Sequence, residues 1–153
     1  MARNPQEIVA DSISEFGNGR ERIMQILTRV NNELSYVPSE AIEAIADATG
    51  VSAAEVYSVV TFYSFFSTEP RGRNIVRLCS TISCAMAGQG EVLDALIEEF
   101  GIEPFETTED YRLTIETTPC IGLCDQAPAM LVNGEPHVKL TPEKACEIVR
   151  GLE

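Results

Sequence analysis

The chain has 153 residues, 44% of them hydrophobic and 23% charged, which is enough for one domain or two small ones to fold without disulfide staples. Its 11 basic and 24 acidic residues give a net charge of −13, which argues against nucleic acid as a partner because that binding depends on Lys and Arg neutralising phosphate. No apolar run approaches the roughly 20 residues of a membrane span, so we expect a soluble, cytoplasmic protein without direct membrane insertion.

The first 70 residues carry the capping signals and the periodicity of four short helices. Asn4 and Pro5 predict the start of a first helix and Gly17 its end, and Ser52 with Glu55 forms a capping box for the fourth. Apolar residues recur every three or four positions in each helix, as expected where helices share one core. The expected ranges are 5–16, 23–34, 39–50 and 53–66. We therefore predict a small four-helix bundle over residues 1–70.

The third and fourth of these helices also resemble a DNA-binding helix-turn-helix. A recognition helix beginning near Val56 should present Arg, Lys, Asn or Gln to base edges. Its polar side instead carries Glu55, Ser58 and Thr61. We therefore expect no contact with nucleic acid. Four aromatic residues, at positions 62, 63, 65 and 66, are too many for one face of this helix, so some should pack between the two halves of the chain or against a partner.

A helix-breaking segment containing Pro70 and Gly72 separates the two halves of the chain. Arg71, Arg73 and Arg77 cluster around it and form the only concentration of positive charge. The segment 78–153, in contrast, holds four basic and fourteen acidic residues, a net charge of −10. The arginines could balance this charge internally or form a docking spot. The acidic half could attract a basic partner surface or be a solvated face.

The second half predicts an α/β domain with the order β-α-β-β-β-α over residues 74–153. Strands are expected at 74–78 and 111–117, with a helix at 90–100 between them, and the two strands should therefore be parallel. The segments 129–132 and 137–140 flank an Asn-Gly-Glu-Pro turn and predict a hairpin. A last helix begins near Thr141. This order is that of a thioredoxin-like domain.

Two short loops place four cysteines directly after the two parallel strands. Cys79 and Cys84 form a C-x4-C pair, and after a gap of 35 residues Cys120 and Cys124 form a C-x3-C pair. Because loops that leave the ends of adjacent parallel strands lie side by side, the two pairs should converge. We predict that these four thiolates surround one metal centre.

Three interpretations compete for these sulfurs. Disulfides are disfavoured by the absence of an apolar signal segment and by an odd cysteine count. Structural zinc takes the same ligands at similar spacing. A two-iron cluster also needs four thiolates, as one pair per iron. Neighbouring apolar residues favour the cluster, because they could form a dry collar that helps set its potential. These residues are Ile82, Met86, Ile121, Leu123 and Met130.

Other chemistry is absent from the sequence. Cys146 lies within the last helix and is interpreted as a small core residue, and His137, the only histidine, as an ordinary strand residue. One histidine supports neither a Rieske-type ligand pair nor a nucleophilic triad. No Gly-x-Gly-x-x-Gly or Walker loop follows a strand. We therefore expect no catalytic residues and no nicotinamide or flavin site in this chain.

At these motifs the chain resembles the thioredoxin-like 2Fe-2S subunit family of NADH dehydrogenase, the small flavoprotein-module subunit of complex I, with relatives in NAD-linked hydrogenases and formate dehydrogenases. The resemblance rests on C-x4-C, on C-I-G-L-C followed by A-P-A-M and a hairpin, and on the segment GVSAAEVYSVVTFYSFF, and it covers nearly the whole chain. One departure is Ala85, where many relatives carry His directly after the second cysteine.

The resemblance implies a 2Fe-2S ferredoxin domain in which Cys79 and Cys84 bind one iron and Cys120 and Cys124 the other. It implies an electron-transfer subunit without turnover of its own, beside a flavoprotein that holds FMN and NAD(H) and further iron-sulfur subunits. The parent complex would be an NADH dehydrogenase, a hydrogenase (electron-bifurcating types included) or a formate dehydrogenase, cytoplasmic and peripheral to the inner membrane. The alternatives from other classes are a zinc-stabilised interaction module and a thiol-disulfide oxidoreductase. The second lacks the usual C-x-x-C pair at a helix start.

Overall fold

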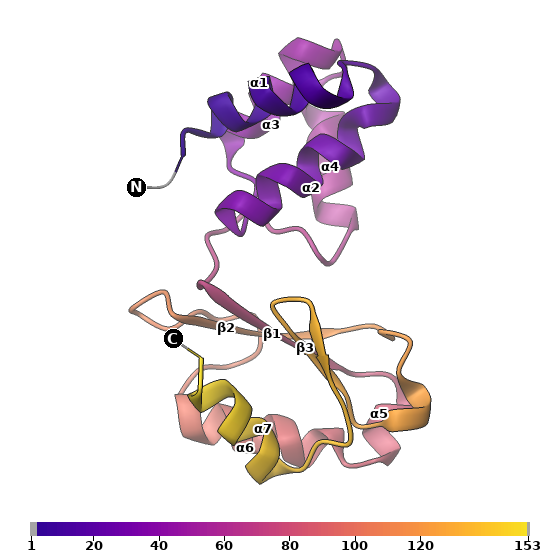
Figure 1. The fold of residues 1–153 in the computed structure, drawn as a ribbon, viewed down its shortest axis with the longest axis vertical. Helices are drawn as coiled ribbons and strands as arrows, with labels where there is room; N and C mark the ends of the chain where they lie inside the picture. The colour runs from indigo at the N-terminus through magenta and orange to yellow at the C-terminus, as the bar shows by residue number, and fades with distance from the viewer. Residues whose placement is uncertain (1–2, 153) are drawn as a thin grey trace. The chain divides into compact units, whose positions relative to one another are not determined.

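The structure is a computed structural model that describes residues 3–152. The chain forms two compact units, Met1–Pro70 and Arg71–Glu153 (Figure 1). The first is helical, and the second combines a mixed sheet with helices. The elements of the first unit are α1 (Pro5–Phe16), the short 3-10 helix η1 (Arg20–Arg22), α2 (Ile23–Leu34), α3 (Ser39–Thr49) and α4 (Ala53–Phe62).

Side-chain caps and one apolar core build the first unit. The Asn4 side chain accepts a hydrogen bond from the Gln6 amide at the start of α1, and Ser52 accepts one from the Glu55 amide at the start of α4. The helices turn their apolar faces to a common core. Its fully buried members include Ile8, Ile26, Leu27, Val30, Ile45 and Val56.

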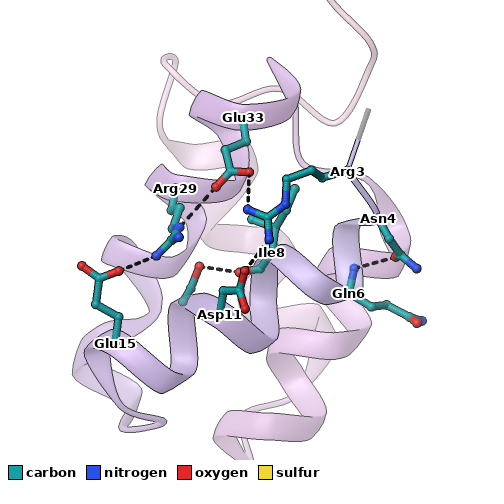
Figure 2. A network of polar contacts seen from close by, with 9 residues as sticks. Arg3, Asn4, Gln6, Ile8, Asp11, Glu15, Arg29 and Glu33 are labelled. Atoms are coloured by element: carbon teal, nitrogen blue, oxygen red, sulfur yellow. Dashed lines mark hydrogen bonds and ion pairs between the residues drawn. The ribbon is translucent and has the colours of Figure 1, made fainter. Parts of the chain in front are cut away.

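A network of ion pairs links the solvent-exposed sides of α1 and α2. The Glu33 carboxylate accepts hydrogen bonds from Arg3 Nη1 at 3.0 Å and from Arg29 Nε at 3.2 Å (Figure 2). Arg3 also pairs with Asp11, and Arg29 with Glu15. Such exposed pairs contribute little singly, so the apolar core remains the main source of stability in this unit.

The fourth helix ends earlier than its sequence predicts. α4 stops at Phe62, and Tyr63 adopts an extended conformation (φ −92°, ψ 116°) instead of continuing to Phe66. Phe62 is 80% exposed, and a continued helix would place Phe66 four positions later on the same exposed face. The chain turns instead, with the Phe66 amide donating to the Tyr63 carbonyl, and Phe66 packs on the core.

The second unit contains a four-stranded sheet in the order β2-β1-β3-β4. β1 and β2 are parallel, and the other two pairings are antiparallel. The predicted order of strands and helices and the parallel pairing are both confirmed. The elements are β1 (Asn74–Cys79), α5 (Ile82–Met86), α6 (Gln89–Phe100), β2 (Leu113–Thr118), the 3-10 helix η2 (Cys124–Gln126), β3 (Met130–Val132), β4 (Glu135–His137) and α7 (Pro142–Arg150).

Helices α6 and α7 pack beside each other on one face of this sheet (Figure 1). The alternation of side chains along β1 and β2 sends every second residue into the core beneath them. That core contains Val76, Leu78, Leu113, Ile115, Val92, Leu96, Ala145 and Val149. The intervening residues, among them Arg77, Cys79 and Glu116, therefore lie on the opposite face of the sheet.

Three local details differ from the sequence prediction. The C-x4-C loop contains the short helix α5. β2 begins at Leu113, because Tyr111 has a positive φ of 54° and closes a turn onto the Thr108 carbonyl. The hairpin turn is only Asn133-Gly134, with φ values of 52° and 90°, so β4 begins at Glu135. Two positive φ values suit the tight turns that match strand twist, which makes the longer predicted turn unnecessary.

No helix between residues 3 and 152 is long and apolar enough to cross a membrane.

Candidate metal centre

The ends of β1 and β2 bring the two cysteine loops together. The two strands are in register from Asn74 opposite Leu113 to Cys79 opposite Thr118, so they end at the same edge of the sheet. The Ser80 amide then donates to the Thr118 carbonyl at 2.9 Å, which holds the loops together for one more residue. In Figure 1, α5 and the loop after β2 lie at this same end of the sheet. The predicted convergence of the loops is therefore present.

The first cysteine pair is buried and held by regular structure. Cys79 is the last residue of β1 and Cys84 lies within α5, and each is 1% exposed. Thr81 is extended and precedes α5, whose first turn is closed by the Ala85 amide donating to the Thr81 carbonyl at 2.9 Å. The Cys79 Sγ lies 3.2 Å from the Thr81 hydroxyl, within reach of a hydrogen bond.

The second pair is exposed and lies on a loop. The Sγ atoms of Cys120 and Cys124 are 3.3 Å apart, and both thiols are free. Gly122 has a φ of +83°, and its amide donates to the Cys120 sulfur at 3.4 Å. A residue with a side chain would be strained at this φ, so glycine allows the amide to approach sulfur.

The pKa values of the thiols follow their different surroundings. Burial alone would raise the pKa of Cys79, but hydrogen bonds with Thr81 and with the neighbouring Cys84 lower it. Burial and the Cys79 sulfur raise the pKa of Cys84, and Cys120 raises that of Cys124. Cys84 is also influenced by the charge of Cys124, so the two pairs interact electrostatically.

The predicted gathering of all four thiolates around one metal centre is not seen in the described part of the chain. Within residues 3–152, no group of three or more His, Cys, Asp or Glu side chains converges to hold a single ion. Two thiolates on one tetrahedral metal, at metal–sulfur distances of about 2.3 Å, lie about 3.8 Å apart. The 3.3 Å separation of Cys120 and Cys124 is close to this value. Cys120 and Cys124 are therefore close enough to bind one metal ion together.

The apolar collar expected around the cysteines is only partly formed. Met130 is fully buried in the sheet core, and Ile121 and Leu123 are half-buried. Ile82 and Met86, however, are 76% and 84% exposed. They lie on the outer side of α5, because the five-residue helix turns Cys84 inward. The prediction of a dry collar is therefore wrong on the α5 side, where an apolar surface faces outward.

A buried ion-pair cluster near the site was not predicted. Arg71 Nη1 and Arg77 Nε donate to the two carboxylate oxygens of Glu116 at 2.9 and 2.8 Å. The side chains of Arg71, Arg77 and Glu116 are 4%, 8% and 9% exposed, respectively. The sequence left open whether these arginines are an internal counter-charge or a docking spot, and the structure shows the internal role for both. Arg73 is exposed. The sequence did hold a signal for this ion pair, because Glu116 is the lone acid in the strand predicted to run parallel to that of Arg77.

The two residues set aside in the sequence lie away from the four cysteines. Cys146 is buried in the core between α6 and α7, where burial raises its pKa to about 11. His137 is a half-buried residue at the end of β4. Both positions agree with the structural roles predicted for them.

The fold and the site define a class of protein, a thioredoxin-like domain with two thiol pairs at one edge of its sheet. Comparison with known families agrees: residues 9–153 match the family described as thioredoxin-like [2Fe-2S] ferredoxin. The chain belongs to this family.

Its relatives are subunits of oxidoreductase complexes. The chain is 34% identical to one subunit of the NADH-quinone oxidoreductase of Escherichia coli strain K12 over 144 residues, 94% of this chain and 87% of that protein. It is 39% identical to subunit 2 of the NADH-quinone oxidoreductase of Thermus thermophilus over 134 residues, 87% of this chain and 74% of that protein.

A solved structure shows a similar fold. An NAD+-reducing [NiFe]-hydrogenase in the air-oxidised state matches with a TM-score of 0.75 and 27% identity. The match covers 86% of this chain and 22% of the hydrogenase chain, so the chain spans about a fifth of that protein's length.

Proposed function

We propose that this chain is the electron-transfer subunit of an NAD-linked oxidoreductase complex and holds one [2Fe-2S] cluster on Cys79, Cys84, Cys120 and Cys124. The observation that carries the proposal is that β1 and β2 end in register, so the loops that hold one buried and one exposed thiol pair leave the same edge of the sheet. Family membership and the relatives' roles as subunits of NADH-quinone oxidoreductase support it. The partner is a flavoprotein subunit that carries FMN and the NAD(H) site, with further iron-sulfur subunits beyond it.

Such a cluster accepts and returns one electron at a time, whereas NADH gives up a hydride, so a flavin on another subunit must separate the two electrons. Within this chain, Cys79 and Cys84 would hold one iron in the folded interior, and Cys120 and Cys124 would hold the other near the surface. The Gly122 amide donates a hydrogen bond to the Cys120 sulfur, and the Thr81 hydroxyl would donate one to Cys79 once that thiol is a deprotonated ligand; such bonds favour the reduced state.

The surface beside the second pair suits a protein partner. No charged residue occurs in segments 78–90 and 117–124, although the second half of the chain is strongly acidic. Ile82 and Met86 are exposed on α5, within the first of these uncharged segments. An exposed apolar patch of this kind marks interaction sites in soluble proteins. We place the flavoprotein contact here, and we assign assembly within the complex to the helical unit of residues 1–70.

The two alternative functions receive less support from the geometry. A thiol-disulfide oxidoreductase needs an accessible low-pKa thiol at a helix N-terminus. Cys79, whose pKa is lowered, is buried at a strand end, and the exposed Cys124 has a raised pKa. A zinc module needs four ligands around one ion. The family that matches this chain is described as a [2Fe-2S] ferredoxin, which favours two irons over zinc.

The experiment compares the isolated chain with the complex captured through a tag on this chain, both under anaerobic conditions. Electron paramagnetic resonance (EPR) spectra are recorded after adding NADH and, separately, dithionite. We expect dithionite to produce a [2Fe-2S] signal in both samples, and NADH to produce it only in the complex, because the isolated chain has no nicotinamide or flavin site.

Two results would overturn the proposal. One is reduction of the isolated chain by NADH, which would place a nicotinamide site in this chain. The other is a complex in which this chain gives no [2Fe-2S] EPR signal after either NADH or dithionite. The Cys120→Ala variant, captured in the same way, is the control that assigns the signal to this chain.

A further inference from the structure

We propose that the buried Arg71–Glu116–Arg77 cluster acts as a fixed positive charge that raises the reduction potential of the [2Fe-2S] cluster. This inference rests on the proposed function, because it assumes that Cys79 is a ligand. The three residues would be positioning residues of electron transfer: they are not themselves ligands of the iron and act on its potential through the electric field.

Arg77 and Glu116 of the ion-pair cluster lie on β1 and β2, on the same sheet face as the proposed ligand Cys79. Side chains alternate along a strand, so Arg77 and Cys79 point to one face, opposite to the core residue Leu78. Two residues along a strand correspond to roughly 7 Å between Cα atoms. Glu116 is the register partner of Arg77 on β2, as Thr118 is of Cys79. The ion pairs therefore lie one residue pair inward from the strand ends where the cysteine loops begin.

The position of Arg71 is fixed by a close backbone contact. The Gly72 amide donates to the Thr114 hydroxyl at 2.7 Å, and a Cβ on Gly72 would lie 2.7 Å from backbone atoms of Leu113. Only glycine allows the chain to run this close to β2. This approach lets Arg71 reach the Glu116 oxygen that Arg77 does not use.

Two guanidinium groups and one carboxylate carry one net positive charge between them. All three side chains are at least nine-tenths buried, so water screens their charges poorly. Reduction adds one electron to the iron centre, and a nearby positive charge stabilises that added negative charge more than it does the oxidised state. The potential should therefore be higher than it would be without the excess charge. Asp125, directly after Cys124, opposes this effect, but it is exposed and water screens its charge more than it screens the buried arginines.

The test changes this net charge in both directions and measures the midpoint potential by an EPR-monitored redox titration of the isolated holo-protein. Arg77→Met leaves a neutral Arg71–Glu116 pair, so we expect a lower potential. Glu116→Gln leaves two positive charges, so we expect a higher potential. Arg150→Met is the control, because it removes an exposed arginine on α7 that pairs with Glu99, and we expect no resolvable shift.

An effect of the electric field should shift the midpoint potential in opposite directions in Arg77→Met and Glu116→Gln. Structural damage would not reverse the sign of the shift between the two variants. Should Glu116→Gln fail to fold, Arg71→Met provides the second measurement. It makes the same change in net charge from a site before β1, and we expect a shift of the same sign as for Arg77→Met but smaller.

Potentials that stay unchanged, or that shift the same way in Arg77→Met and Glu116→Gln, would overturn the inference while leaving the proposed function intact. A wild-type chain that assembles no iron-sulfur cluster would instead refute the proposed function itself.

Discussion

The two cysteine pairs differ in how the chain holds them. Cys79 and Cys84 are buried within a strand and a helix, so their positions are set by folding of the second unit. Cys120 and Cys124 are exposed on a loop, and Gly122 between them depends on a positive φ. One half of the site is therefore part of the fold, and the other half is a surface loop that the proposed metal centre and partner would organise. Each prediction below tests this difference.

The largest expected effect is loss of the iron-sulfur cluster on replacing either kind of ligand. Cys84→Ala and Cys120→Ala should both abolish the visible absorption of the purified protein, whereas Cys146→Ala should retain it. The metal-free forms should differ. Removing the buried Cys84 side chain should lower the free energy of unfolding by about 1–2 kcal/mol. Removing the exposed Cys120 should change it by less than about 0.5 kcal/mol. Equal destabilisation in urea titrations would contradict the comparison.

The metal-free protein should show the difference in thiol reactivity. A buried thiol reacts only when the structure around it opens. If this local opening costs about 3 kcal/mol of free energy, the reaction is slowed roughly a hundredfold. Iodoacetamide should therefore label Cys120 and Cys124 about a hundred times faster than Cys79 and Cys84, as followed by peptide mass spectrometry. The lowered pKa of Cys79 works in the other direction by increasing its thiolate fraction. Labelling of Cys79 first would show that its pKa outweighs its burial.

Cys146 shows what burial does to a thiol with no stabilising donor. Burial, followed by the nearby Glu99 carboxylate, raises its pKa from 9.0 to about 11. As pH rises, the Cys146 thiol loses its proton in the unfolded chain before it does so in the folded one. The free energy of unfolding therefore falls between pH 9 and pH 11. Above pH 11 the thiol is ionised in both states, so its effect no longer changes with pH. The loss should be about 2 kcal/mol. Urea unfolding at pH 8 and pH 11 should show it as a difference between wild type and Cys146→Ala, and identical pH dependence in both proteins would contradict it.

The smallest expected effect concerns two glycines with positive φ, one in each cysteine region. Gly122→Ala and Gly88→Ala should each cost about 1 kcal/mol in unfolding, because both φ values, +83° and +95°, strain a residue with a side chain. Only Gly122→Ala should also accelerate bleaching of the iron-sulfur cluster by a chelator, since only Gly122 donates to a ligand sulfur. Equal bleaching rates in the two variants would show that this amide contact has no effect on the cluster.

Most of the fold followed from local signals. Caps at Asn4 and Ser52 located helix starts, and the alternation of strands and helices in the second half predicted the parallel pairing that joins the cysteine loops. The early end of α4 could not be predicted from these signals. It depends on tertiary packing, in which Phe62 is exposed and Phe66 packs on the core. Nor could α5 be predicted, because a five-residue helix is too short to show periodicity.

The site was predicted less completely than the fold. Spacing and strand order predicted that the two cysteine loops lie at one edge of the sheet, but spacing does not determine that one pair is buried and the other exposed. The outward position of Ile82 and Met86 depends on the direction in which α5 turns Cys84. The sharing of Glu116 by Arg71 and Arg77 depends on sheet register and on the close approach at Gly72, and both are tertiary properties.

The central claim is tested most directly by metal and sulfide analysis of the anaerobically purified wild-type chain, with EPR spectra before and after dithionite. The account predicts a brown protein with about two irons and two sulfides per chain, no zinc, and a paramagnetic signal that appears on reduction. A colourless protein that holds one zinc ion and remains silent after dithionite would contradict it.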